Sequence, residues 1–152
     1  MNGKERVNLS KVIEKMNLVK SYTRYRCKGI WIHVPEFNRP ALQLTGFYDQ
    51  FDNDRIQIIG NVEYSYLKSL SETERYERYM QLLSSNIPCL IFCRNLEPEA
   101  RDYRACKEVS EYLFLSQRSL HLHFQSEVIR WLKVQLAPCI VIHGVLVDVY
   151  GE

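Results

Sequence analysis

His143 is the residue whose type and setting come closest to those of a reactive group in this sequence. It lies in "CIVIHGVLVDVY", residues 139–150, near the end of an apolar run and directly before Gly144. Strand ends in α/β enzymes often present polar groups, and an imidazole that titrates near neutral pH suits proton transfer or phosphate contact. Asp148, five residues later, adds a carboxylate. A lone histidine in an apolar strand is also commonly structural, so spacing alone leaves both interpretations open.

Two further pairs contain residue types that bind metal ions. His121 and His123 form a His-x-His pair in "SLHLHF", which would place two imidazoles on one side of an extended segment. No carboxylate accompanies them at a fixed spacing, so packing is the simpler interpretation. Cys89 and Cys93 would project to one face of a strand, but a zinc knuckle needs a two-residue spacing and a second ligand pair. We therefore expect buried structural thiols and no metal site.

The tyrosine-rich segment "YSYLKSLSETERYERYM", residues 64–80, could form a stacking surface for nucleic-acid bases. Aromatic residues at helical spacing are more often packing residues whose polar tips reach solvent. The charge balance also argues against nucleic acid, because 20 basic and 18 acidic side chains leave a net charge of only +2. We expect no nucleic-acid partner.

The segments that must position these residues alternate between strands and helices. Strands are expected at residues 29–37, 54–60, 88–94 and 111–116, and helices at 11–18, 38–47, 61–70, 71–83, 97–110 and 126–136. Their starts are marked by Asn8 or Ser10, by Asn38 before Pro40, and by a capping box of Ser71 and Glu74. Short buried strands separated by helices predict an α/β, three-layer-like domain with a mainly parallel sheet flanked by helices. Residues 139–150 differ, and predict either a hairpin or one long strand with a bulge at Gly144.

Length and composition set the outer limits. A chain of 152 residues suits one domain, which buries about two thirds of the surface that its unfolded state exposes. No apolar stretch of about eighteen residues occurs, and the first residues lack the apolar core of an export signal. Five scattered cysteines do not suit a disulfide framework. We expect a cytoplasmic protein with reduced thiols and no membrane segment.

Two long stretches carry a resemblance to a known family. They are "NRPALQLTGFYDQFDNDRIQIIGNVEYSYLKSLSETER", residues 38–75, and "QLAPCIVIHGVLVDVYG", residues 135–151. Together they resemble the amino-terminal part of HPr kinase/phosphorylase, a bacterial enzyme that phosphorylates and dephosphorylates a serine of the phosphocarrier protein HPr. The resemblance runs from about Val7 to the last residue and is weakest in "FLSQRSLHLHFQSE", residues 114–127.

The resemblance implies a division of the chain. Residues 1–138 would be the amino-terminal domain, and residues 139–152 a β lead-in to a kinase domain that is absent from this chain. In the family a phosphate-binding loop, Gly-x-x-x-x-Gly-Lys-Ser/Thr, follows the lead-in, and none of the six glycines here begins such a motif. His143 matches an active-site histidine of the family, so the resemblance gives it a catalytic role only beside the kinase domain, with ATP and Mg as cofactors. The chain alone is expected to be inactive and to bind no cofactor.

The implied function is a non-catalytic domain for assembly or regulation in a bifunctional HPr serine kinase/phosphorylase that controls carbon catabolite repression and sugar uptake. The implied partners are the kinase domain, HPr and further copies in a homo-oligomer, and the implied fold is similar to the first domain of the Mur ligases. The alternative is a free-standing small-ligand or protein-binding module that retains the fold without the kinase half. A hydrolase based on His143 would lack a nucleophile pair.

Overall fold

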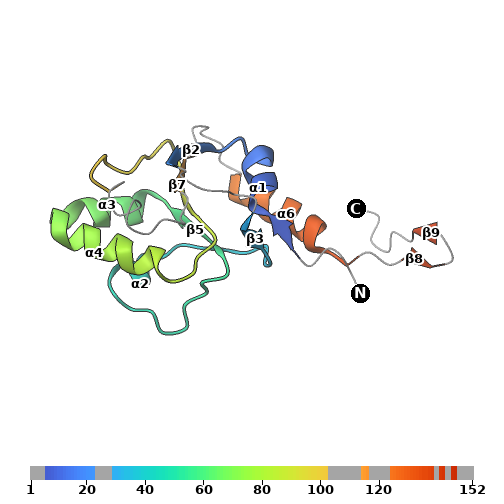
Figure 1. Cartoon of the computed structure of the whole chain (residues 1–152), viewed down its shortest axis with the longest axis horizontal. Coiled ribbons are helices and arrows are strands. Elements are labelled where there is room, and N and C mark those ends of the chain that lie inside the picture. The colour runs from blue at the N-terminus through green and yellow to red at the C-terminus, as the bar shows by residue number, and fades with distance from the viewer. Residues whose placement is uncertain are drawn as a thin grey trace.

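Strands and helices alternate along most of the chain (Figure 1). The computed structural model describes residues 6–22, 29–102, 114–116, 124–138, 141–142 and 145–146. In these residues the strands are β1 (Val7–Asn8), β2 (Val19–Tyr22), β3 (Trp31–Ile32), β4 (Phe37–Asn38), β5 (Ile56–Ile59), β6 (Leu90–Phe92), β7 (Phe114–Ser116), β8 (Val141–Ile142) and β9 (Val145–Leu146). The helices are α1 (Leu9–Lys15), α2 (Ala41–Leu44), α3 (Asn61–Ser69), α4 (Glu72–Leu83) and α6 (Phe124–Leu136).

The central sheet has five strands in the order β2-β7-β6-β5-β4. Strands β4, β5, β6 and β7 are parallel, and β2 pairs antiparallel with β7 at one edge. The predicted α/β domain with a mainly parallel sheet is therefore confirmed. Strand β2 was not predicted. It joins the sheet beside β7, a partner from far along the chain, and an antiparallel edge strand of this kind is common in α/β folds.

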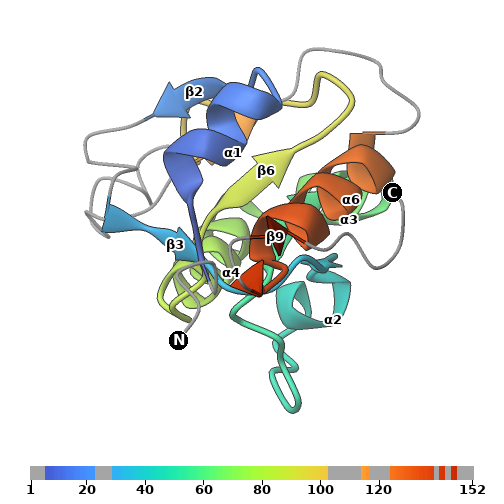
Figure 2. The same ribbon diagram turned by 90° about the vertical axis from the view of Figure 1, so that its right-hand side faces the viewer.

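Helices cover both faces of this sheet. Alternation along β5 sends Ile56 and Ile58 to one face and Gln57 and Ile59 to the other. The first face packs against α1 and α6, and the second against α2, α3 and α4. Figure 1 shows these two groups of helices on opposite sides of the sheet, and Figure 2, seen from the side of α1 and α6, shows both helices in front. The result is three layers with two apolar cores.

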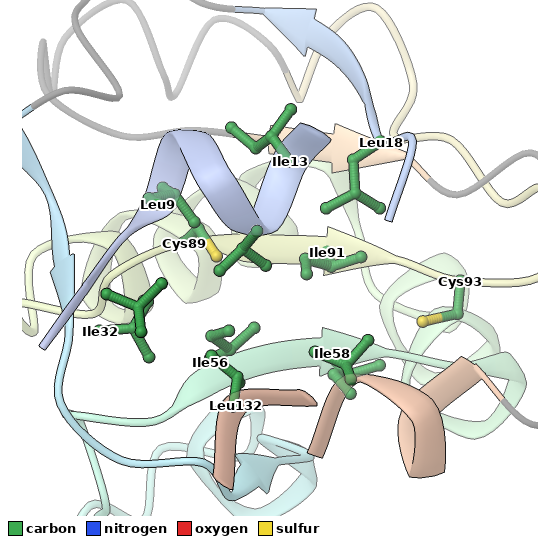
Figure 3. Close-up of a cluster of buried hydrophobic side chains, with 13 residues drawn as sticks. Leu9, Ile13, Leu18, Ile32, Ile56, Ile58, Cys89, Ile91, Cys93 and Leu132 are labelled. Atoms are coloured by element: carbon green, nitrogen blue, oxygen red, sulfur yellow. The ribbon is translucent and has the colours of Figure 1, made fainter. Parts of the chain in front are cut away.

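Each core stabilises the fold because its apolar side chains are almost completely buried. Figure 3 shows the core under α1 and α6, to which β5 and β6 also contribute side chains. The residues labelled there are Leu9, Ile13, Leu18, Ile32, Ile56, Ile58, Cys89, Ile91, Cys93 and Leu132. The second core is built from Leu44, Ile59, Leu67, Tyr79, Leu82, Leu83, Ile87, Leu90 and Phe92. Burial of one such large apolar side chain is worth about 1.5–3 kcal/mol. The tyrosines Tyr64, Tyr66 and Tyr76 pack against this second core, which confirms their expected packing role.

Local capping fixes where two helices begin. The Asn8 side chain accepts a hydrogen bond from the Ser10 amide at 3.0 Å and caps α1. The Ser71 hydroxyl accepts from the Glu74 amide at 3.2 Å and caps α4. Both predicted starts are confirmed, and each cap lies within three residues of the amide that donates to it.

The predicted cap at Asn38 is wrong. Asn38 belongs to β4, and its Nδ2 donates to Oε1 of the buried Gln57 at 2.6 Å, so its amide is occupied across the sheet. Pro40 takes the cap position of α2, which is only four residues long. The strand expected at 29–37 is likewise divided between β3 and β4, which belong to different sheets.

The helix expected at 97–110 does not begin where predicted. Residues 97–102 form turns and irregular backbone, and 103–110 lie outside the described residues. The reason is that the Asp102 carboxylate binds Arg75 and the Glu99 amide, contacts that hold this segment in a turn. Residues 139–150 contain the antiparallel pair β8 and β9, which favours the hairpin over the single bulged strand. None of the described helices combines the length and apolar content needed to cross a lipid bilayer.

Candidate functional site

The histidines singled out in the sequence are not among the residues that the structure describes. His143, with Asp148 nearby in the sequence, and the pair His121 and His123 all lie outside the described ranges. Their roles therefore stay predictions. Within the described ranges, no group of three or more His, Cys, Asp or Glu side chains could hold a metal ion.

Cys89 and Cys93 are thiols that form no disulfide, on the first face of the sheet at opposite ends of β6 (Figure 3). Both are buried, at 1% and 6% exposure, which confirms the expected structural role. Burial raises the pKa of Cys93 to about 11, and the positive charges of Arg39 and Arg94 oppose this effect only in part. A thiol with so high a pKa is a weak nucleophile at neutral pH.

The carboxyl ends of β4, β5 and β6 bring together the charged residues best placed to meet a ligand. Arg39 follows β4, Gly60 follows β5, and Arg94 follows β6. In open α/β sheets, ligands bind outside the carboxyl ends of the strands. We call the side chains of Arg39 and Arg94, together with the backbone at Gly60, the edge site.

Arg39 is held in a defined orientation by a buried carboxylate. Its Nε lies 3.0 Å from Oε1 of Glu63, and its Nη2 lies 3.3 Å from Oε2. The Glu63 side chain is 3% exposed, whereas that of Arg39 is 52% exposed. Such a fork-shaped pair fixes the plane of the guanidinium as well as its position. Arg39 is therefore both accessible and oriented.

Gly60 makes this arrangement possible. Its amide donates to Glu63 Oε2 at 3.0 Å, which satisfies a free N–H at the start of α3. A Cβ at Gly60 would collide with Nη2 of Arg39. A side chain at this position would therefore require the Arg39 guanidinium to shift from its place beside Glu63.

The segment after β6 has an unusual backbone. Arg94 and Asn95 both adopt left-handed conformations, with φ of 55° and 60°. Each such residue costs on the order of 1 kcal/mol, and strained residues of this kind cluster at functional sites. Arg94 is exposed and forms no ion pair within the described ranges. Arg39 and Arg94 both lie beyond the carboxyl ends of parallel strands, and β5 is the one strand between β4 and β6.

An ion-pair network fastens the following residues to α4. Arg75, on α4, donates through Nε to Asp102 at 2.8 Å and through Nη2 to Glu99 at 3.2 Å. The contact with Asp102 raises the pKa of Arg75 further, so the guanidinium stays charged. Tyr64, on α3, donates from its hydroxyl to the Glu97 carbonyl at 2.8 Å. These contacts fix the path of the chain that leaves the edge site.

Sequence reasoning missed Arg39, Glu63 and Arg94. One local signal was present, because Gly60 and Glu63 stand at the cap and third positions of a predicted helix, as in a capping box. Arg39 lies 24 residues before Glu63, so no spacing rule connects the two. Only the register of β4 beside β5 brings them together.

Comparison with known proteins identifies relatives of this chain. A family model described as HPr Serine kinase N terminus matches residues 7–132. The chain belongs to this family. The predicted resemblance is confirmed, and the matched range includes the edge site and the Arg75 network.

Members of the HPr serine kinase family with curated names match nearly the whole chain. An HPr kinase/phosphorylase of Lachnoclostridium phytofermentans is 47% identical over 146 residues, which is 96% of this chain and 47% of the relative. The HPr kinase/phosphorylase of Alkaliphilus metalliredigens is 38% identical over 95% of this chain and 46% of its own length. That of Caldicellulosiruptor bescii is 41% identical, again over 95% and 46%. The chain thus spans slightly under half the length of these relatives.

Proposed function

We propose that this chain is an amino-terminal, non-catalytic domain of a bifunctional HPr serine kinase/phosphorylase, with a role in assembly or regulation. One observation carries the proposal: the match takes up 96% of this chain but only 47% of the relative from Lachnoclostridium phytofermentans. More than half of that relative therefore lies outside the match, and this part can carry the activity for which the relative is named.

The chemistry of phosphate transfer supports the same division. Phosphoryl transfer is catalysed mainly by positioning and by charge, from a backbone cradle, a lysine and bound magnesium ions. The present sequence contains no Gly-x-x-x-x-Gly-Lys-Ser/Thr loop to supply that cradle. We place ATP, Mg and the HPr substrate on the kinase domain of the complete enzyme, and His143 beside them as an active-site residue contributed from the lead-in at 139–152.

Several finer features belong to this proposal. Residues 1–138 form the domain, its fold is similar to the first domain of the Mur ligases, and the complete protein is a cytoplasmic homo-oligomer. Its biological role is control of carbon catabolite repression and sugar uptake through HPr. The three-layer fold supports the likeness in fold, and membership of the family supports the biological role. Each feature can be tested separately.

The first test is an assay of the 152-residue chain alone. HPr is incubated with ATP, magnesium and the chain, and serine phosphorylation is followed by mass spectrometry. We expect no transfer, whereas the full-length relative from Lachnoclostridium phytofermentans, as the positive control, phosphorylates HPr. Transfer by the chain at ordinary enzyme concentration would overturn the non-catalytic assignment.

The second test addresses assembly and regulation in the full-length relative. One variant lacks the residues that match positions up to 138 of this chain and keeps the lead-in with the position of His143, and a second carries residues 1–138 of the present chain in their place. We expect the truncated variant to keep phosphate transfer but to change its oligomeric mass or its response to effectors, and the chimera to restore both. A truncated variant that matches the full-length enzyme in mass and in regulation would contradict the proposed role.

The second candidate is a small-ligand-binding module that functions without a kinase. It is favoured by one observation, the half-exposed Arg39 that a buried carboxylate orients at the carboxyl edge of the sheet. A chimera that fails to restore regulation, together with saturable ligand binding by the chain alone, would favour this candidate.

A further inference from the structure

Arg39 has hydrogen-bonding capacity that its partner does not use. Glu63 engages Nε and Nη2, and the guanidinium carries five N–H donors in total. No acceptor for Nη1 lies within the described residues, and the side chain is 52% exposed. The buried carboxylate thus holds one side of the guanidinium and leaves the other free to meet a ligand.

Arg94 supplies a second guanidinium from the end of β6, two strands away from β4. Its side chain is exposed, and the strained backbone at Arg94 and Asn95 fixes the direction in which the chain leaves the strand. With Arg39 and Glu63, Arg94 makes a group of two positive charges and one negative charge. The edge site therefore keeps one net positive charge where α/β sheets bind ligands.

One N–H group at the start of α3 is already occupied. The Gly60 amide, at the cap position of α3, donates to Glu63 and is not available to a ligand. The two arginines are the charged groups of the edge site that remain accessible. Arg94 can be substituted without altering the contact between the Gly60 amide and Glu63, so the site is testable with the helix start unchanged.

We propose that the edge site binds a phosphate group, with Arg39 and Arg94 donating to its oxygens from two strand ends. A phosphate dianion has the charge and the several acceptor oxygens that two guanidinium groups match, and arginine is suited to bidentate contacts with it. The same group occurs as free phosphate and as a phosphate monoester. The proposal does not depend on a kinase role for the chain.

The test is a titration of the 15N-labelled 152-residue chain followed by amide chemical shifts. Inorganic phosphate is one arm, ribose 5-phosphate is a second, and sodium chloride at matched ionic strength is the reference. We expect saturable shifts at Gly60, Arg94 and Asn95, with a dissociation constant of about 1–10 mM for phosphate. Tighter binding of ribose 5-phosphate would assign the ligand as a monoester, and equal or weaker binding would assign it as free phosphate.

Three variants separate specific contacts from general charge effects. Arg94→Gln is expected to weaken binding at least about fivefold. The double variant Arg39→Gln/Glu63→Gln keeps the net charge of the chain, leaves no buried carboxylate unpaired, and is expected to weaken binding by a similar factor. Arg55→Gln is the matched control, because Arg55 directly precedes β5 and so lies at the amino ends of the parallel strands, away from the edge site. Among the described residues it forms an ion pair only with the exposed Asp52. It is expected to bind as the wild type does.

The proposal is overturned if no saturation is reached by about 50 mM phosphate. It is also overturned if Arg94→Gln binds normally, or if Arg55→Gln weakens binding as much as Arg94→Gln does. If the double variant does not fold, the comparison of Arg94→Gln with Arg55→Gln decides alone.

Discussion

Replacing Asp102 with alanine should measure how strongly the segment after β6 is fastened to α4. The side chains of Arg75 and Asp102 are only 9% and 7% exposed, and Nε lies 2.8 Å from Oδ1. Removing one partner of a buried ion pair typically costs about 3–5 kcal/mol, because the remaining charge stays buried without compensation. Glu99 still contacts Arg75 and is 46% exposed, so it offsets part of the loss. We expect a decrease of about 3 kcal/mol in the free energy of unfolding.

A neighbouring pair provides the control. Arg101 and Glu72 are closer, with Nη1 2.6 Å from Oε2, but their side chains are 63% and 54% exposed. Exposed pairs are worth about 0–1 kcal/mol because water screens both charges. Arg101→Ala should therefore cost less than about 1 kcal/mol although it breaks the shorter contact. We expect burial, and not distance, to decide which of the two ion pairs contributes more to the free energy of unfolding.

Urea unfolding followed by circular dichroism gives each free energy of unfolding. A third variant, Arg75→Met/Asp102→Leu, removes both charges and should lie within about 1 kcal/mol of the wild type. If Arg101→Ala is as destabilising as Asp102→Ala, or if Asp102→Ala costs less than about 1 kcal/mol, the reasoning from burial is wrong.

Three further predictions concern a helix cap, a buried thiol and the candidate active-site histidine. Ser71→Ala should lower the free energy of unfolding by about 1 kcal/mol, because it removes the cap of α4. The control is Ser65→Ala, in the exposed middle of α3, which should change the free energy of unfolding by less than about 0.5 kcal/mol in the same urea titrations. Because the pKa of Cys93 is raised from 9.0 to about 11, the unfolded chain loses this proton first. The stability difference between wild type and Cys93→Ala should therefore be constant below pH 9 and fall as the pH rises toward 11, and a difference that grows over this range would contradict the assignment. His143→Ala should cost little stability if the side chain lies exposed at a strand end, and a loss above about 2 kcal/mol by thermal or urea unfolding would show a buried structural histidine instead.

The elements that were predicted correctly are those whose signals are local. The apolar run Ile56–Ile59 ends at Gly60, and Ser71 stands three residues before Glu74. Each signal involves residues close together in the chain, so the sequence reports it directly. The two short strands β1 and β2 have no such signal. They exist because they pair with β3 and with β7, which lie far away along the chain.

Asn38 shows how a local signal fails. An asparagine before a proline is a good helix start by type and position. In the fold its amide donates to the buried Gln57, 19 residues away, and the helix begins after Pro40 without that cap. An unsatisfied buried polar group is costly, so the contact with the buried Gln57 amide stabilises the fold more than a cap on the short helix α2 would.

The sequence by itself determined the α/β class, most helices and strands, and, through two long motifs, the family. The tertiary structure alone decided the edge site and the Arg75 network. Arg39 meets Glu63 across 24 residues, and Arg75 meets Asp102 across 27. The physical reason is that backbone propensity and capping act within a few residues, whereas strand order and register set which distant side chains share a strand end.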